Sequence, residues 1–173
     1  MTALKLRFFI SYVIYLLLSL IFVLLQSSGI VTLQIGYASA VLILPLTVYA
    51  GYYFGEYFGA TFGLIVGAVT DAFASTLCFN TVILTVCGFA AGLLVTRLFN
   101  RNLSAAVVMN LVGGFAYFFL KWLVLYAFRD PAAGFILTRF SLTSFVYTAV
   151  LGILLYFLLN LILGKLPIRP SKR

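Results

Sequence analysis

The stretch GYYFGEYFGATFGLIVGAVTD, residues 51–71, decides how the chain folds. Glycine recurs in it at every fourth position, and Asp71 stands where the next glycine of the series would fall. On a helix this spacing keeps the glycines along one side, where the missing Cβ atoms let a second helix approach closely. The stretch therefore predicts a tightly packed helix over about residues 57–75.

The five glycines are expected to divide into two groups. Gly59, Gly63 and Gly67 fall inside the predicted helix and form a smooth ridge for close packing. Gly51 and Gly55 precede it and are predicted to lie in a turn at the membrane surface. The ridge has two readings: packing within the chain, or a dimerisation face on the outside that would make a homodimer.

The composition indicates a membrane protein. The 173 residues are 65% hydrophobic and only 8% charged, whereas a soluble domain carries about 25% charged residues. Apolar stretches long enough to cross a hydrocarbon core of about 30 Å recur along almost the whole chain. We predict an all-α integral membrane protein, with a single transmembrane domain over residues 1–173. Its bundle of six transmembrane helices is expected at about 8–27, 33–53, 57–75, 79–98, 103–128 and 140–163, and Pro45 is expected to kink the second.

The basic residues predict the orientation. With the N-terminus inside, the outer loops contain only Arg129 and Arg139, and the other basic residues near helix ends fall on the cytoplasmic side. Those residues are Lys5, Arg7, Arg97, Arg101, Lys165, Arg169, Lys172 and Arg173. Both termini are therefore predicted to be cytoplasmic, next to anionic lipid headgroups. No basic face interleaved with aromatic residues lies off the membrane, which argues against nucleic-acid binding.

Asp71 and Lys121 are the acid and the base that lie well inside predicted spans. Because a charge in hydrocarbon is costly, we hypothesise that the two side chains pair within the bundle. The alternative is that Asp71 reaches water in the outer loop and Lys121 extends outward past Trp122. Asn110 and Tyr117 share a helix face with Lys121.

The last predicted helix carries a second ridge of small and polar residues. Ser144, Thr148 and Gly152 follow one another at four-residue spacing. Such a face either lines a solute pocket or bonds one helix to another.

The sequence contains no recognisable set of catalytic residues. The chain has no histidine to act as a base, and its three acids, Glu56, Asp71 and Asp130, fall at different predicted depths. It has neither a cysteine and histidine cluster for a metal nor a glycine-rich phosphate loop after a strand. We expect no enzymatic activity, no metal and no cofactor.

The central part of the chain resembles a known family. The run GLIVGAVTDAFASTLCFNTVILTVCGFAAGLL, followed by TRLFNRN and a long apolar helix, resembles the MreD family of rod-shape membrane proteins. The chain departs from the family pattern at Ser75, Phe79 and Lys121. The positions that match it are Gly63, Gly67, Asp71, Asn80, Gly88 and Gly92, and then the turn Leu98, Phe99, Asn100, Arg101 and Asn102.

The resemblance implies a function. Such a protein would be a non-enzymatic scaffold of the cell-elongation and peptidoglycan-synthesis machinery in the bacterial cytoplasmic membrane. It would bind the transmembrane part of the bitopic protein MreC, and through it MreB filaments, RodA and its transpeptidase partner. Its small-residue ridges would receive a partner helix, and its inner turns and basic tail would meet cytoplasmic partners or anionic lipid.

A second resemblance points to transport. Six spans with hardly any soluble mass are also the format of the S component of energy-coupling-factor vitamin transporters, whose fold the MreD family is similar to. An outward-facing pocket for a vitamin or other small solute would then be lined by Asn110, Tyr117, Lys121, Trp122, Tyr126, Ser144 and Tyr147. Against this, the first predicted helix lacks the A-x-x-x-A motif with which such proteins often dock.

Overall fold

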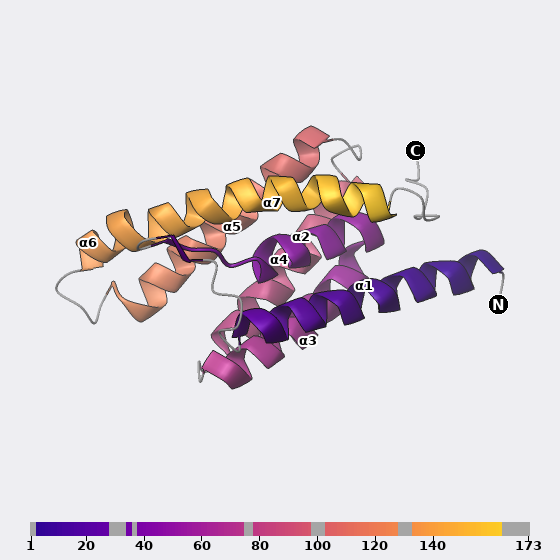
Figure 1. The fold of residues 1–173 in the computed structure, drawn as a ribbon, viewed down its shortest axis with the longest axis horizontal. Coiled ribbons are helices and arrows are strands. Elements are labelled where there is room, and N and C mark those ends of the chain that lie inside the picture. The colour runs from indigo at the N-terminus through magenta and orange to yellow at the C-terminus, as the bar shows by residue number, and fades with distance from the viewer. Residues whose placement is uncertain are drawn as a thin grey trace.

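A computed structural model describes residues 3–27, 34–35, 38–74, 78–97, 103–127 and 133–163. Within these residues the protein is a bundle of helices with one very short strand pair (Figure 1). In chain order the elements are α1 (Ala3–Ser27), β1 (Gln34–Ile35), β2 (Ala38–Ser39), α2 (Ile43–Phe54), α3 (Glu56–Ala74), α4 (Phe79–Arg97), α5 (Leu103–Leu125), α6 (Ala133–Ile136), the π-helix η1 (Leu137–Ser141) and α7 (Leu142–Leu163). The last three are consecutive and form one long helical segment.

Four helical segments in the described part of the chain are long and apolar enough to cross a membrane: Glu56–Ala74, Phe79–Arg97, Leu103–Leu125 and Gly134–Leu161. The chain is therefore an all-α, multi-pass membrane protein. The 25-residue helix α1 contains the shorter apolar run Phe9–Leu24. The predicted count of six spans is not confirmed: four of the described segments are long enough, and the second predicted span is not one long helix.

The prediction of a helix over residues 33–53 is wrong in its first half. The helix α2 begins at Ile43, and residues before it form the antiparallel pair β1–β2, in which Gln34 faces Ser39 and Ile35 faces Ala38. Pro45 gives a physical reason, since inside a helix it would lack an N–H and clash with the preceding turn. A start at Ile43 puts Pro45 in the first turn, where no N–H is needed. The predicted kink at Pro45 is therefore also wrong.

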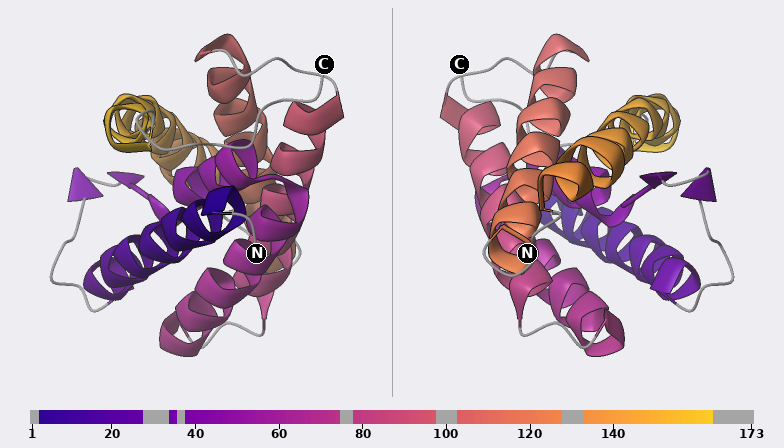
Figure 2. Two further views of the ribbon diagram at one scale, coloured as in Figure 1. Left: turned by 90° about the vertical axis from the view of Figure 1, so that its right-hand side faces the viewer. Right: turned by 90° about the vertical axis from the view of Figure 1, so that its left-hand side faces the viewer.

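The helix α2 is the core of the protein. All of its 12 residues are buried, and it contacts α1, α3, α4, α5 and α7. The end-on views in Figure 2 show it in the middle of the other helices. Twelve residues rise only about 18 Å, which is short of the hydrocarbon thickness of about 30 Å. The helix α2 is thus an internal element that the membrane-crossing helices surround.

The extended segment before α2 is held by hydroxyl groups of α7. The Ser39 backbone N–H donates to Ser144 Oγ, and the Val41 backbone N–H donates to Thr148 Oγ1, each over 3.1 Å. Non-helical backbone at membrane depth requires such internal partners, because lipid offers none. Both hydroxyls come from the small and polar ridge of the last helix, and this ridge therefore bonds one segment of the chain to another.

Thr148→Val should destabilise the protein by about 1–3 kcal/mol, because it leaves the half-buried Val41 N–H without its acceptor, the hydroxyl of the buried Thr148. Thr143→Val is the matched control: Thr143 is exposed, and its hydroxyl bonds the Arg139 and Phe140 carbonyls of its own helical segment. The control should stay within about 0.5 kcal/mol of the wild type. Denaturant unfolding of the purified protein in detergent micelles measures both, and equal losses would contradict the role given to Thr148.

The start of α1 and the end of α7 lie at the same end of the molecule (Figure 1). The side of the membrane that this end faces stays a prediction. The predicted turn over residues 98–102 and the basic tail from residue 165 onward lie outside the described residues.

Candidate functional site

The glycine ridge of α3 packs directly on α4. A methyl group added at Gly63 would come within 3.0 Å of the backbone of Leu84 and Thr85, and one added at Gly67 would meet the backbone of Asn80 and Thr81 in the same way. Atoms at that separation overlap, so these two glycines let the antiparallel helices approach backbone to backbone. Among the described helices, α3 and α4 have the most extensive contact with each other.

The same packing continues where three helices meet. Gly59 of α3 lies against Gly88 of α4 and Gly51 of α2, and Gly51 also lies against the backbone of Gly88 and Gly92. Four glycines from three helices thus form one crossing point. The prediction that Gly51 lies in a surface turn is wrong, since it is a buried residue inside α2.

Gly55, by contrast, does lie between two helices. Its φ of 98° falls in the left-handed region, and its N–H donates to the Gly51 carbonyl, which ends α2. Glycine takes this conformation without the steric cost that a Cβ would add. The helix α3 begins at the next residue, Glu56.

Asp71 closes the other end of the α3–α4 pair. Its side chain is buried, and its Oδ1 accepts hydrogen bonds from the Asn80 backbone N–H (3.1 Å) and the Asn80 Nδ2 (2.9 Å). Its Oδ2 accepts from the Thr81 backbone N–H (2.7 Å) and the Thr81 hydroxyl (2.6 Å). Asn80 and Thr81 are the second and third residues of α4, whose first-turn N–H groups have no partner within the helix. Asp71 therefore caps a helix other than its own and places a carboxylate at its positive end.

Tyr117 of α5 extends this polar cluster, because its hydroxyl donates to Asn80 Oδ1 over 2.7 Å. Both side chains are buried. The sequence pattern placed Asp71 and Tyr117 correctly inside helices but did not connect them, and it missed Thr81 entirely. The sequence did contain a signal for this cluster: Asn80 and Thr81, two polar residues in the first turn of α4, follow Asp71 by nine and ten positions. The pairing of Asp71 with Lys121 stays a prediction.

Asn110 joins α5 to α7. It is buried against Gly152, where any Cβ would overlap the Asn110 amide, and its Nδ2 donates to the Ala149 carbonyl over 3.2 Å. The Tyr49 hydroxyl of α2 donates to the Gly152 carbonyl over 2.8 Å. Gly152 is thus in contact with two other helices.

The residues predicted to receive a partner helix contact other parts of this chain. This is so for all eight, namely Gly59, Gly63, Gly67, Gly88, Gly92, Ser144, Thr148 and Gly152. All eight are buried inside the bundle, so the ridges do not form an exposed dimerisation face. A binding surface for another protein would have to use other side chains.

A cavity of about 420 Å³ lies beside Lys121, between the strand β2, α5 and the segment from α6 to α7. Its lining residues are Ser39, Phe118, Lys121, Tyr126, Ile136, Phe140, Ser141 and Ser144. Lys121, Tyr126 and Ser144 belong to the pocket set predicted from the sequence. Asn110 and Tyr117 instead take part in the helix contacts above, and Tyr147 lines a separate groove along α7 with Leu142, Thr143, Val146 and Val150. Trp122 packs its ring against Phe119.

The described residues contain no group of three or more histidine, cysteine, aspartate or glutamate side chains that could hold a metal ion. Glu56 and Asp71 lie near opposite ends of α3, about 22 Å apart along its axis. Glu56 accepts a hydrogen bond from the Thr96 hydroxyl over 2.9 Å. These two acids therefore serve different ends of the α3–α4 pair and do not form a catalytic dyad.

Comparison with protein families, with curated proteins and with solved structures finds no match to this chain.

Proposed function

We propose that this protein is a non-enzymatic membrane scaffold of the bacterial cell-elongation machinery, as the resemblance to the MreD family implies. One observation carries the proposal. The matching residues Gly63, Gly67, Asp71 and Asn80, together with the glycines of α4, assemble into a single unit, the α3–α4 pair capped by Asp71. The pattern thus marks a closely packed structural element, which suits a scaffold.

The proposed partner is the transmembrane helix of an MreC-like bitopic protein, with indirect links to MreB, RodA and its transpeptidase partner. Because the small-residue ridges are filled within the chain, this helix would pack on the outer, apolar side chains of the bundle. The basic ends of the chain would face anionic lipid if both termini are cytoplasmic.

Depletion of the protein from its host is expected to make the cells wider and rounder, because wall synthesis would lose its elongation scaffold. Cell width under the microscope is the measurement. Re-expression of the wild type or of Glu56→Gln, whose carboxylate makes a hydrogen bond near the exposed end of α3, should restore the width. Unchanged width after depletion would overturn the proposal.

The cavity beside Lys121 favours a second candidate, a solute-binding S component of an energy-coupling-factor transporter. Three residues of the predicted pocket line it, and 420 Å³ is within the range of about 300–1,000 Å³ for small-molecule sites. Mass spectrometry of the denatured, purified protein would settle the ranking. A vitamin recovered in near-stoichiometric amount would replace the scaffold proposal, and its absence would leave the scaffold in first place.

A further inference from the structure

The cavity beside Lys121 combines a cation, several hydroxyl groups and an apolar wall. We propose that it binds an anionic amphiphile, whose phosphate or carboxylate group lies at Lys121 and whose apolar part lies against the aromatic wall. The inference rests on neither the scaffold nor the transport proposal, because it concerns only what this cavity can hold.

Charge is the first argument. Lys121 lies in the membrane-crossing helix α5, four residues before its last residue, Leu125, and is half-buried. A lysine cation in such a place is expensive without a partner. None of the cavity-lining residues that the structure describes is acidic. Among the described acids, Asp71 caps α4 and Glu56 lies at the far end of α3. A bound anion would place a negative charge beside this cation.

Hydrogen-bond donors are the second argument. Ser39, Ser141, Ser144 and Tyr126 line the same cavity as Lys121. Ser144 Oγ already accepts the Ser39 backbone N–H, so its own hydroxyl hydrogen is left to donate. An ammonium group with nearby hydroxyl donors suits the oxygens of a phosphate or carboxylate, which accept several charge-assisted hydrogen bonds.

The apolar wall and the π-helix are the third argument. Phe118, Ile136 and Phe140 line the cavity together with the polar groups. The widened turn of η1 brings the consecutive residues Phe140 and Ser141 to the cavity at once. Single π turns inside α-helices are frequent at functional sites. One wall thus offers an apolar ring beside a hydroxyl, which matches a ligand with an apolar and a polar part.

Hydroxyl side chains bond to the backbone around the widened turn. The Thr138 hydroxyl donates to the Gly134 and Phe135 carbonyls, each over 3.2 Å, and the Thr143 hydroxyl donates to the Arg139 and Phe140 carbonyls. Hydroxyls that bond back to the preceding turn often bend a helix, and here they accompany the irregular turn that lines the cavity.

The first arm of the test asks whether the ligand is a membrane lipid. The protein is reconstituted in nanodiscs of equal phosphatidylglycerol and phosphatidylcholine, and native mass spectrometry counts the lipids that it retains. The wild type should prefer phosphatidylglycerol. Lys121→Gln should lower the preference about tenfold or more, the factor expected for a lost charge-assisted hydrogen bond. The Lys121→Arg variant keeps the positive charge, and it should retain most of the preference for phosphatidylglycerol.

The second arm asks whether the ligand comes from water. Octyl phosphate is titrated into nanodiscs of phosphatidylcholine alone, and the fluorescence of the chain's single tryptophan, Trp122, next to Lys121, reports binding. Saturable binding that Lys121→Gln weakens about tenfold, without a phosphatidylglycerol preference in the first arm, identifies a water-soluble amphiphile. The preference in the first arm identifies a lipid.

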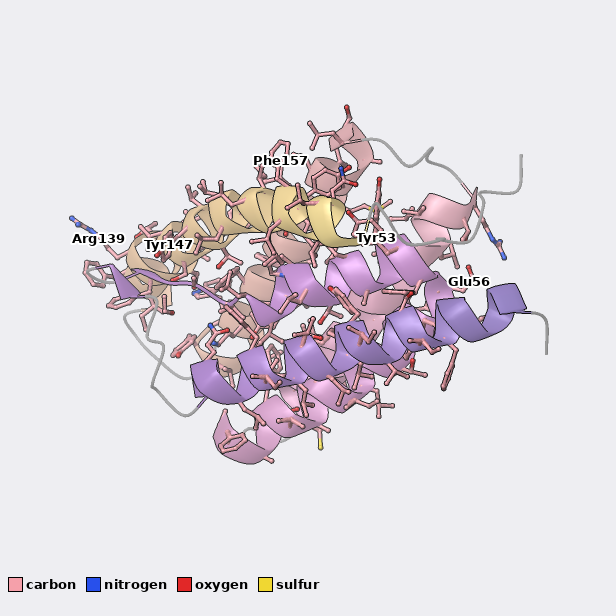
Figure 3. The ribbon with its side chains drawn as sticks, turned by 45° about the vertical axis from the view of Figure 1, so that its right-hand side comes forward. Tyr53, Glu56, Arg139, Tyr147 and Phe157 are labelled. Atoms are coloured by element: carbon pink, nitrogen blue, oxygen red, sulfur yellow. The ribbon has the colours of Figure 1, made fainter. Side chains whose placement is uncertain are left out.

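Arg139→Gln is the matched control for both arms. Arg139 belongs to η1, which lines the cavity with Phe140 and Ser141, but its own side chain is exposed and points away from the bundle (Figure 3). The Arg139→Gln variant should bind both probes as the wild type does. An equal loss in Arg139→Gln would show only a general surface charge and would overturn the proposal. Unchanged binding of both probes by Lys121→Gln would overturn it as well.

Discussion

Asp71→Ala should lower the free energy of unfolding by about 3 kcal/mol or more, because it leaves the buried donors of Asn80 and the half-buried donors of Thr81 without an acceptor. It also removes the charge at the N-terminus of α4. Asp71→Asn should lose less, since one amide oxygen still accepts while the amide nitrogen faces the Thr81 N–H. Unfolding in bicelles by a denaturing detergent, followed by far-UV circular dichroism, measures both variants.

Glu56→Gln is the control for these two variants. Glu56 also accepts a hydrogen bond from α4, but its partner, the Thr96 hydroxyl, is exposed. An exposed polar contact of this kind contributes little, so the change should stay within about 0.5 kcal/mol. If Asp71→Ala stayed within the same limit, the assignment of Asp71 as the cap of α4 would be wrong.

Gly63→Ala should destabilise the protein by about 1–3 kcal/mol, because the new methyl group collides with the backbone of α4 at Leu84 and not with a movable side chain. To relieve the overlap, α3 and α4 must separate, which weakens the contacts along both helices. Thermal unfolding in detergent, read by size-exclusion chromatography of the surviving folded fraction, measures the loss.

Gly134→Ala makes the same chemical change where there is room. A methyl group at Gly134 would meet nothing within 4 Å, and the residue is exposed near the start of the last helical segment. Since alanine favours helix over glycine by up to about 1 kcal/mol, the control should be neutral or slightly stabilising. Matching behaviour of the two variants would mean that α3 and α4 are not in backbone contact.

Much of the fold could be read from the sequence because the membrane imposes a length on each crossing helix. The helices α3, α4 and α5 lie close to the ranges that the apolar stretches predict. The helix α2 could not be predicted in this way, because its apolar run continues into residues that pair as strands. The informative signal was Pro45, which the prediction treated as a kink inside a helix when it marks a first turn.

The candidate site could be predicted only in part. Asp71 stood out as a costly charge, and a search for a partner of opposite charge led to Lys121. Hydrogen bonds from backbone amides are invisible in such a search, since every residue carries an amide and only the fold shows which ones lack a partner. The same holds for Thr148, whose acceptor role depends on an extended segment more than a hundred positions earlier in the chain.

The distance along the chain between α7 and the segment before α2 also constrains how the protein is made. The Ser39 and Val41 amides find their acceptors on residues 105 and 107 positions later. At synthesis rates of about 5–20 residues per second, roughly 5 to 20 s separate the emergence of these amides from that of their partners. During that interval they need water or the insertion machinery, because lipid would leave them unsatisfied. The final place of the segment that leads into the innermost helix, α2, therefore depends on α7, which is synthesised more than a hundred residues later.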